Sequence, residues 1–137
     1  MRNFMSSVIQ QWHQLLEQRD FAQLNILLAD DVVFWSPVMY RPQHGKFMTA
    51  LYLTAAYQVL FNSSFLYVRE VIGDQDAVLE FEVEIDGILI NGVDMIRWNA
   101  AAQIIDFKVM VRPLKAMNLL HQKMAQMLAS APQANSI

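Results

Sequence analysis

The second half of the chain contains four successive segments typical of strands, and the alternation of apolar and polar residues in the second and the last of them constrains the fold most. The segments cover residues 65–72, 77–86, 88–99 and 104–112. Alternation with a period of two gives a strand one apolar face and one polar face. The pattern therefore predicts an antiparallel sheet that buries one face, with a hairpin at Asp86-Gly87.

The first half is mainly helical in its periodicity. Apolar residues at helical spacing predict a helix over residues 4–18. A second helix starts at Asp20, where Gln23 has the spacing of a capping box, and Asp30-Asp31 end it. Its buried side is expected to contain Phe21, Leu24, Leu27 and Leu28.

The remaining elements follow from turn residues and apolar spacing. Residues 32–36 are β-branched and aromatic, which predicts a short strand before the loop at 37–45. A third helix covers residues 46–61, and Pro113 opens a last one, 114–129, before a tail at 130–137. The apolar positions of the third helix include Phe47, Leu51, Tyr52, Ala55 and Val59.

This order of elements predicts an α+β fold. The 137 residues suit one domain, with a core over residues 4–113 and an extra C-terminal helix. A curved antiparallel sheet wrapped over the first helix would form a cone open at one end. We expect Trp12, Phe34, Asp94 and Trp98 to point into it.

Asp94 is the most unusual residue of the predicted sheet. Alternation along residues 90–98 places it on one face with Ile90, Gly92, Ile96 and Trp98. A carboxyl group among apolar side chains costs stability unless it is paired or has a function. Asp94 is therefore the candidate catalytic residue, and an ion pair or backbone hydrogen bonds are the structural alternative.

Composition excludes several classes of partner. Hydrophobic residues make up 55% of the chain, the net charge is −3, and Lys and Arg form no cluster. Nucleic acid and anionic membranes are therefore poor partners. The chain has no Cys, its three His are scattered, and the start does not resemble a signal peptide, so we expect no metal, no cofactor and a cytoplasmic location.

Several motifs together resemble the nuclear transport factor 2-like superfamily, which has a cystatin-like fold. They are Leu-Leu-Ala-Asp-Asp-Val-Val-Phe at 27–34, the Pro37 loop with Gly45, and Gly-Val-Asp-Met-Ile-Arg-Trp at 92–98. The chain is most similar to the SnoaL-like branch, kin of ketosteroid isomerases and polyketide cyclases. The resemblance covers about residues 4–113, and it implies the fold more strongly than any one activity.

The catalytic positions of the ketosteroid isomerases can be compared one by one with the residues of this chain. They use an Asp base after the first strand and an oxyanion hole made of a Tyr and a protonated Asp. The resemblance places Ser36 at the base and Trp12 at the tyrosine, and only Asp94 matches. Steroid isomerisation by that mechanism is therefore not expected. Polyketide cyclases of the superfamily carry His and Asp near the last two strands, where this chain offers Asp106 without a His. The epoxide-hydrolase branch uses an inward Asp-Arg-Asp cluster, which is not matched because Arg97 is out of phase with Asp94.

Two functions are favoured over protein transport, the role of the superfamily's namesake, because nothing in the sequence points to a specific protein partner. The first is a protein that binds a small apolar ligand in the cone and acts on it as an isomerase, cyclase or lyase through Asp94. The second is a non-enzymatic module for ligand binding or dimerisation. The candidate ligand-binding residues are Trp12, Phe34, Ser36, Tyr40, Tyr52 and Trp98.

The outer face of the predicted sheet is not wholly polar. Val93, Met95 and Met110 interrupt its row of charged residues. Members of the superfamily commonly pair sheet to sheet, so the resemblance implies a homodimer through this face. Glu80, Glu82 and Glu84 are expected to be solvated, with Lys108 and Arg112 as partners across the sheet.

Overall fold

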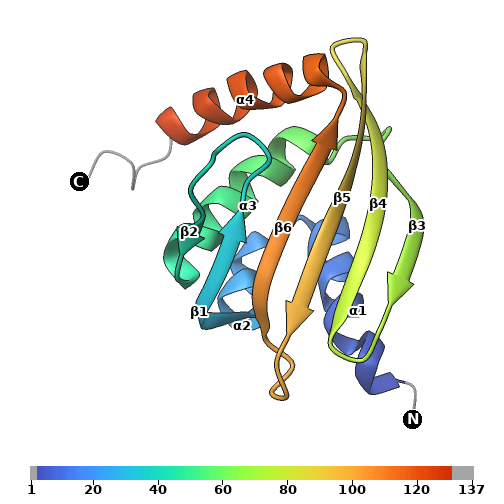
Figure 1. Ribbon diagram of the computed structural model, residues 1–137, viewed down its shortest axis with the longest axis vertical. Coiled ribbons are helices and arrows are strands. Elements are labelled where there is room, and N and C mark those ends of the chain that lie inside the picture. Colours follow the sequence, from blue (N-terminus) through green and yellow to red (C-terminus); the bar gives the residue numbers. More distant parts are fainter. Residues whose placement is uncertain (1–2, 131–137) are drawn as a thin grey trace.

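The computed structural model of the chain describes residues 3–130. In this structure, helices pack on one side of a curved six-stranded sheet (Figure 1). The helices are α1 (Asn3–Gln18), the short 3-10 helix η1 (Phe21–Gln23), α2 (Leu24–Leu27), α3 (Lys46–Leu60) and α4 (Leu114–Ala129). The strands are β1 (Leu28–Trp35), β2 (Gln43–His44), β3 (Leu66–Ile72), β4 (Asp76–Ile85), β5 (Ile88–Trp98) and β6 (Ile104–Arg112). The predicted α+β class, with a curved sheet and a C-terminal helix, is confirmed.

The strand order is β2-β1-β6-β5-β4-β3. Strands β3 to β6 pair antiparallel, as predicted, and β1 joins β6 in parallel. The sheet is therefore mixed. Local alternation identifies a strand but carries no information on which distant strand it will pair with, so the parallel pair was not predicted.

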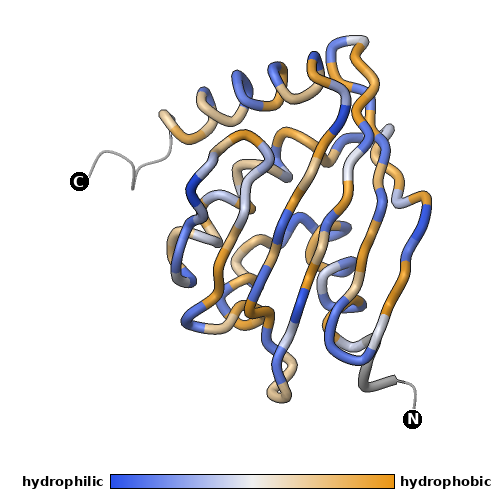
Figure 2. The backbone as a smooth tube through the Cα atoms, in the orientation of Figure 1, coloured by the Kyte–Doolittle hydropathy of each residue, from blue (hydrophilic) through white to orange (hydrophobic). Residues whose placement is uncertain are grey.

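The predicted faces and hairpin of the sheet are present. Hydropathy alternates along β4 in Figure 2, and burial alternates along β5, where Ile90, Asp94 and Trp98 are among the buried inward positions. Asp86 and Gly87 have φ values of 52° and 78°. Positive φ at both central residues is typical of the tight two-residue turn that suits strand twist.

Two local predictions in the first half are wrong. Asp30 and Asp31 do not end a helix, because β1 already begins at Leu28 and carries both acids exposed at an irregularity in its register with β6. Asp20 and Gln23 do not form a capping box. The Gln23 amide donates to the Asp20 carboxylate over 3.3 Å, and the Asp20 side chain bonds no backbone N–H of η1.

The helix α3 buries a different face from the one that its largest apolar residues suggest. The buried positions are Thr49, Leu53, Ala55, Ala56, Tyr57 and Leu60. Phe47 is 57% exposed, and Leu51, Tyr52 and Val59 are partly buried. The helix is apolar on all sides, so periodicity could not determine which side faces the sheet.

The C-terminal helix α4 packs against α3 and β6 (Figure 1). Ala116, Leu120 and Met124 are its buried residues, whereas Leu114 is 71% exposed. Within residues 3–130, no helix combines the length and the apolar character needed to cross a bilayer.

Gly92 allows β5 to pass close to an aromatic side chain. A Cβ atom at this position would lie 2.4 Å from Phe81 Cζ and 2.9 Å from the carbonyl oxygen of Met110. Phe81 is the partner of Gly92 in the β4–β5 register and is completely buried. The ring therefore occupies the space that a side chain on residue 92 would need.

We expect Gly92→Ala to lower the free energy of unfolding by about 1–3 kcal/mol, because the added methyl group overpacks the core. Urea unfolding of the two proteins measures this difference. Phe81→Leu removes part of the ring, so Gly92→Ala should cost less in that background. An equal cost in both backgrounds would contradict the proposed clash.

Candidate functional site

Asp94 is completely buried at the centre of a hydrogen-bonded network. The Tyr57 hydroxyl donates to its Oδ1 over 2.5 Å, and the Tyr67 hydroxyl donates to its Oδ2 over 2.5 Å. Trp12 Nε1 in turn donates to the Tyr67 hydroxyl over 2.9 Å. The network therefore joins β5, α3, β3 and α1 through polar atoms inside the core.

Each aromatic residue of the network lies on the buried face of its own helix or strand. Tyr57 lies four residues after Leu53 on the buried face of α3. Tyr67 points inward on β3, between the exposed Leu66 and Val68. Trp12 lies on the buried stripe of α1, four residues after Val8.

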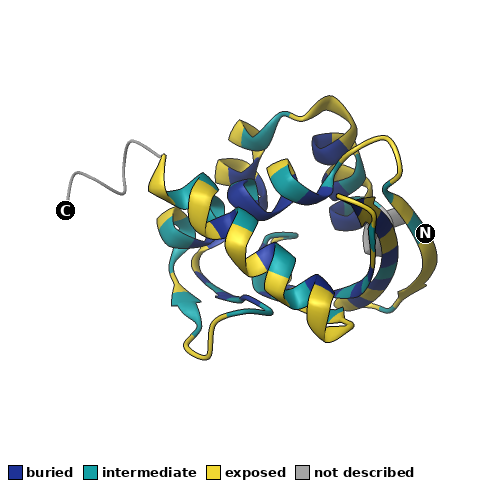
Figure 3. Cartoon of the chain, turned by 90° about the horizontal axis from the view of Figure 1, so that it is seen from above, coloured by how far each residue is buried: buried dark blue, intermediate teal, exposed yellow. Residues whose placement is uncertain are grey.

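Aromatic rings fill the inside of the sheet around the network. Trp12 lies edge-on to Tyr57 and to Phe107, with ring centroids 5.2 and 5.0 Å apart, and Phe65 stacks on Phe81 at 5.2 Å. Figure 3 shows the buried residues where helices and sheet face each other. Asp94 has no exposed surface, and it does not line the surface pockets between η1, α3 and α4 or on the outer face of the sheet.

Burial is the main influence on the pKa values of Asp94, Tyr57 and Tyr67. Removal from water raises the pKa of Asp94 to about 7, although the hydrogen bonds from Tyr57 and Tyr67 act in the opposite direction. Burial, and next the charge of Asp94, raise the pKa of both tyrosines well above the ordinary value. The tyrosines therefore stay protonated, and Asp94 changes its charge near neutral pH.

The structure brings some of the predicted ligand-binding residues together. Trp12, Phe34 and Trp98 are buried on the same side of the sheet as Asp94. Tyr52 is partly buried, and its ring centroid lies 6.4 Å from that of Phe34.

Ser36 and Tyr40 belong to the segment that follows β1. Ser36 is 8% exposed, and its hydroxyl accepts a hydrogen bond from the Val38 N–H over 3.2 Å, as a loop serine often does. Tyr40 is 98% exposed in the loop before β2, so its ring does not line the interior.

Tyr57 and Tyr67 are the network residues that the sequence did not identify as partners of Asp94. Alternation over residues 65–72 puts Tyr67 on the same face as Phe65. That signal could have marked the hydroxyl as a partner for a buried acid, because a buried tyrosine usually finds a hydrogen-bond partner.

Charged residues on the outer face are engaged with one another. Glu80 pairs with Arg69 at 2.9 Å and accepts a hydrogen bond from Asn91. The Asn91 hydrogen bond, and next Arg69, lower the pKa of Glu80, and the charge of Arg112 acts in the same direction. Asp106 accepts from Trp35 Nε1 over 3.0 Å, and Arg97 pairs with Asp76 at 3.2 Å. Within the described residues, no three His, Asp or Glu side chains are grouped as a metal site would need.

We expect the contribution of Asp94 to stability to fall as pH rises. Between about pH 4 and pH 7 the folded protein keeps the Asp94 proton and the unfolded chain has released it. The free energy of unfolding then falls with pH, by up to about 1.4 kcal/mol per pH unit from this group. Urea unfolding from pH 4.5 to pH 8.5 should show the difference between wild type and Asp94→Asn falling up to pH 7 and then levelling.

The matched control is Asp74→Asn, which makes the same substitution at an exposed carboxylate in the turn before β4. A difference between wild type and Asp94→Asn that grows with pH would contradict the expectation. It would mean that the tyrosine hydrogen bonds outweigh burial and hold Asp94 ionised.

Comparisons with known proteins place this geometry in a family. The chain is similar to a solved structure described as a steroid delta-isomerase from Pseudomonas aeruginosa, with 33% identity over 92% of each chain and a TM-score of 0.86. It is also similar to a protein with a cystatin-like fold from Silicibacter pomeroyi, with 29% identity, a TM-score of 0.86, and 94% of this chain and 90% of that chain covered.

A proposed SnoaL-like polyketide cyclase from Shewanella putrefaciens shares the fold at 13% identity, with a TM-score of 0.61 and coverage of 93% of this chain and 86% of that chain. No family model and no curated protein matches the sequence. The predicted resemblance is confirmed by the structural relatives. The chain belongs to the nuclear transport factor 2-like superfamily, and it shares this fold with the SnoaL-like cyclase.

Proposed function

We propose that this SnoaL-like protein is a binding module that takes up a small apolar ligand and performs no acid–base chemistry at Asp94. The observation that carries the proposal is the state of the Asp94 carboxyl group. Both of its oxygens accept hydrogen bonds from tyrosines, and the residue has no exposed surface. A general acid or base must come within hydrogen-bond reach of its substrate, and a carboxyl group that is completely buried and bonded at both oxygens supports a structural role.

The acid–base enzyme is the second candidate, and one observation favours it. Burial raises the pKa of Asp94 to about 7, which suits proton transfer near neutral pH. A relative with 33% identity is described as a steroid delta-isomerase. Against this candidate, the Ser36 hydroxyl already bonds Val38 N–H, and the Trp12 N–H bonds Tyr67, so neither group is directed at a ligand.

A steroid with a β,γ-unsaturated ketone separates the two candidates. We expect the wild type not to accelerate its conversion to the conjugated ketone, which absorbance in the ultraviolet follows, because the substrate cannot contact Asp94. Tyr57→Phe and Asp94→Asn should give the same background rate as the wild type. The result that overturns the proposal is a wild-type rate that falls about 100-fold or more in Asp94→Asn and is retained in Asp74→Asn.

The outer face of the sheet is where we propose that a second copy of the chain binds. Val71, Val78 and Met95 are cross-strand neighbours, with exposed fractions of 61%, 37% and 37%. Met95 is paired in register with Lys108, whose ammonium lies 5.0 Å from the Trp35 ring centroid. A hollow of about 670 Å³ follows this row across the sheet. An apolar row of this kind on a sheet face favours a partner surface over solvent.

We expect sedimentation at micromolar concentration to give a species of twice 15.8 kDa for the wild type. Met95→Glu should shift it to the 15.8 kDa monomer, because a carboxylate would be buried without a partner in the paired sheets. Leu114→Glu makes the same change at a 71% exposed position on α4 and should leave the dimer intact. A wild-type protein that sediments only as the monomer would remove the proposed interface.

A further inference from the structure

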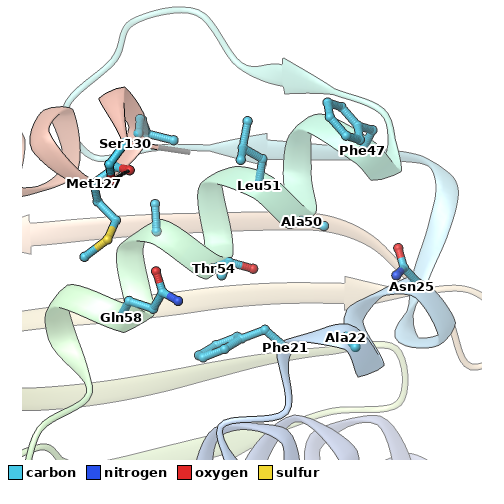
Figure 4. Close-up of a pocket in the computed structure, with 12 residues that line it drawn as sticks. Phe21, Ala22, Asn25, Phe47, Ala50, Leu51, Thr54, Gln58, Met127 and Ser130 are labelled. Atoms are coloured by element: carbon cyan, nitrogen blue, oxygen red, sulfur yellow. Dashed lines mark hydrogen bonds between the residues drawn. The ribbon is translucent and has the colours of Figure 1, made fainter. Parts of the chain in front are cut away.

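A pocket outside the curved interior lies between η1, α3 and the end of α4 (Figure 4). Its volume is about 530 Å³, within the range of roughly 300–1,000 Å³ of small-molecule sites. The pocket is separate from the Asp94 network, because Asp94, Tyr57, Tyr67 and Trp12 are not among the residues that line it. The proposed function did not assign this site.

The α3 wall of the pocket is a continuous helical stripe. Its members recur at spacings of three and four residues, and they are Phe47, Ala50, Leu51, Thr54, Ala55 and Gln58. The stripe begins with apolar residues and continues to a hydroxyl and an amide. Small alanine side chains leave the hollow, and Phe21 from η1 and Met127 from α4 form walls around it (Figure 4).

The pocket lining carries no ionisable side chain. Lys46 is the neighbour of Phe47 in sequence, but its ammonium donates to the Asn25 carbonyl over 2.7 Å and lies 3.3 Å from the Asp30 carboxylate. A charged ligand would therefore lose hydration without gaining a partner in the pocket. The chemistry of the lining favours a neutral ligand.

Two of the polar side chains that line the pocket lie next to each other on α3 and can orient such a ligand. Figure 4 shows Thr54 and Gln58 around the same space as Phe21 and Met127. Within residues 3–130, the Thr54 hydroxyl and the Gln58 amide make no hydrogen bond to another residue, whereas the Ser130 hydroxyl is already bonded to the Met127 carbonyl over 2.9 Å. The hydroxyl and the amide each offer a donor and an acceptor to an alcohol or a carbonyl oxygen.

We infer that this pocket is the ligand site of the module and takes a neutral small molecule with an apolar body and a hydrogen-bonding oxygen at one end. The apolar body lies along Phe21, Leu51 and Met127, and the oxygen meets Thr54 and Gln58. This inference rests on the proposed binding function and names its site and ligand class.

Octan-1-ol, octanoate and octylammonium share one chain length and differ in the charge of the end group. Titration of 15N-labelled protein should give amide shifts for octan-1-ol in η1, in α3 from Ala50 to Gln58, and at the end of α4. Octanoate and octylammonium should bind at least about tenfold more weakly, because their charges find no partner. Equal affinity for the three probes, or shifts centred elsewhere, would overturn the inference.

Two variants test the assignment by residue. Ala50→Phe fills the pocket and should abolish the octan-1-ol shifts, whereas Ala101→Phe, on the exposed turn before β6, should leave them unchanged. Thr54→Val keeps the shape and removes the hydroxyl, and should weaken octan-1-ol about three- to tenfold. If Ala50→Phe does not fold, Thr54→Val and the comparison of octan-1-ol with octanoate and octylammonium still test the site. Octan-1-ol binding that is as strong in Thr54→Val as in the wild type would contradict the contact between the ligand oxygen and Thr54.

The failure of this inference differs from the failure of the proposed function. Absence of any octan-1-ol shift, or shifts around Trp12 and Asp94, would overturn the pocket assignment and leave the isomerisation result unchanged. Steroid isomerisation that depends on Asp94 would overturn the proposed function, whether or not octan-1-ol shifts the amide signals around Thr54.

Discussion

The burial of one carboxyl group is the constraint on which the centre of this protein depends. A buried carboxyl group without partners would cost several kcal/mol, so its oxygens have to be satisfied inside the core. Tyr57 and Tyr67 satisfy them, and Trp12 holds the hydroxyl of Tyr67. These contacts fix α1, α3 and β3 relative to Asp94 on β5. The network thus gives a unique arrangement to a core whose other contacts are mostly apolar and less directional.

The same network limits what the interior can do. In the ketosteroid isomerases that the chain resembles, an acid at the position of Asp94 faces a ligand. In this chain, tyrosines and aromatic rings occupy the space around the acid. On our proposal, ligand binding is found instead on the helical side of the molecule, and the outer face of the sheet binds a second copy. On this proposal the interior stabilises the fold, the helical side binds the ligand, and the outer face of the sheet forms the dimer.

Much of the fold could be predicted because its signals are local. The alternation in β4 and β5, the Asp86-Gly87 turn and the stripe of α1 each express a short-range period, and each element was found near its predicted place. Predictions failed where local signals were ambiguous. The α3 helix is apolar on all sides, and the pair of acids at Asp30 and Asp31 looked like a helix end but lies in an irregular part of β1.

The sequence by itself determined that Asp94 lies on an inward face with Ile96 and Trp98, because strand side chains alternate strictly. It also indicated the superfamily, through motifs spread over most of the chain. Only the tertiary structure decided what surrounds the acid. Tyr57 and Tyr67 lie 37 and 27 residues away from it in sequence, and their meeting depends on the orientation of α3 and on the pairing of β3 with β4. Periodicity gives the face of an element, but contacts between distant elements follow from how those faces pack, and that packing decided that the interior is filled around Asp94.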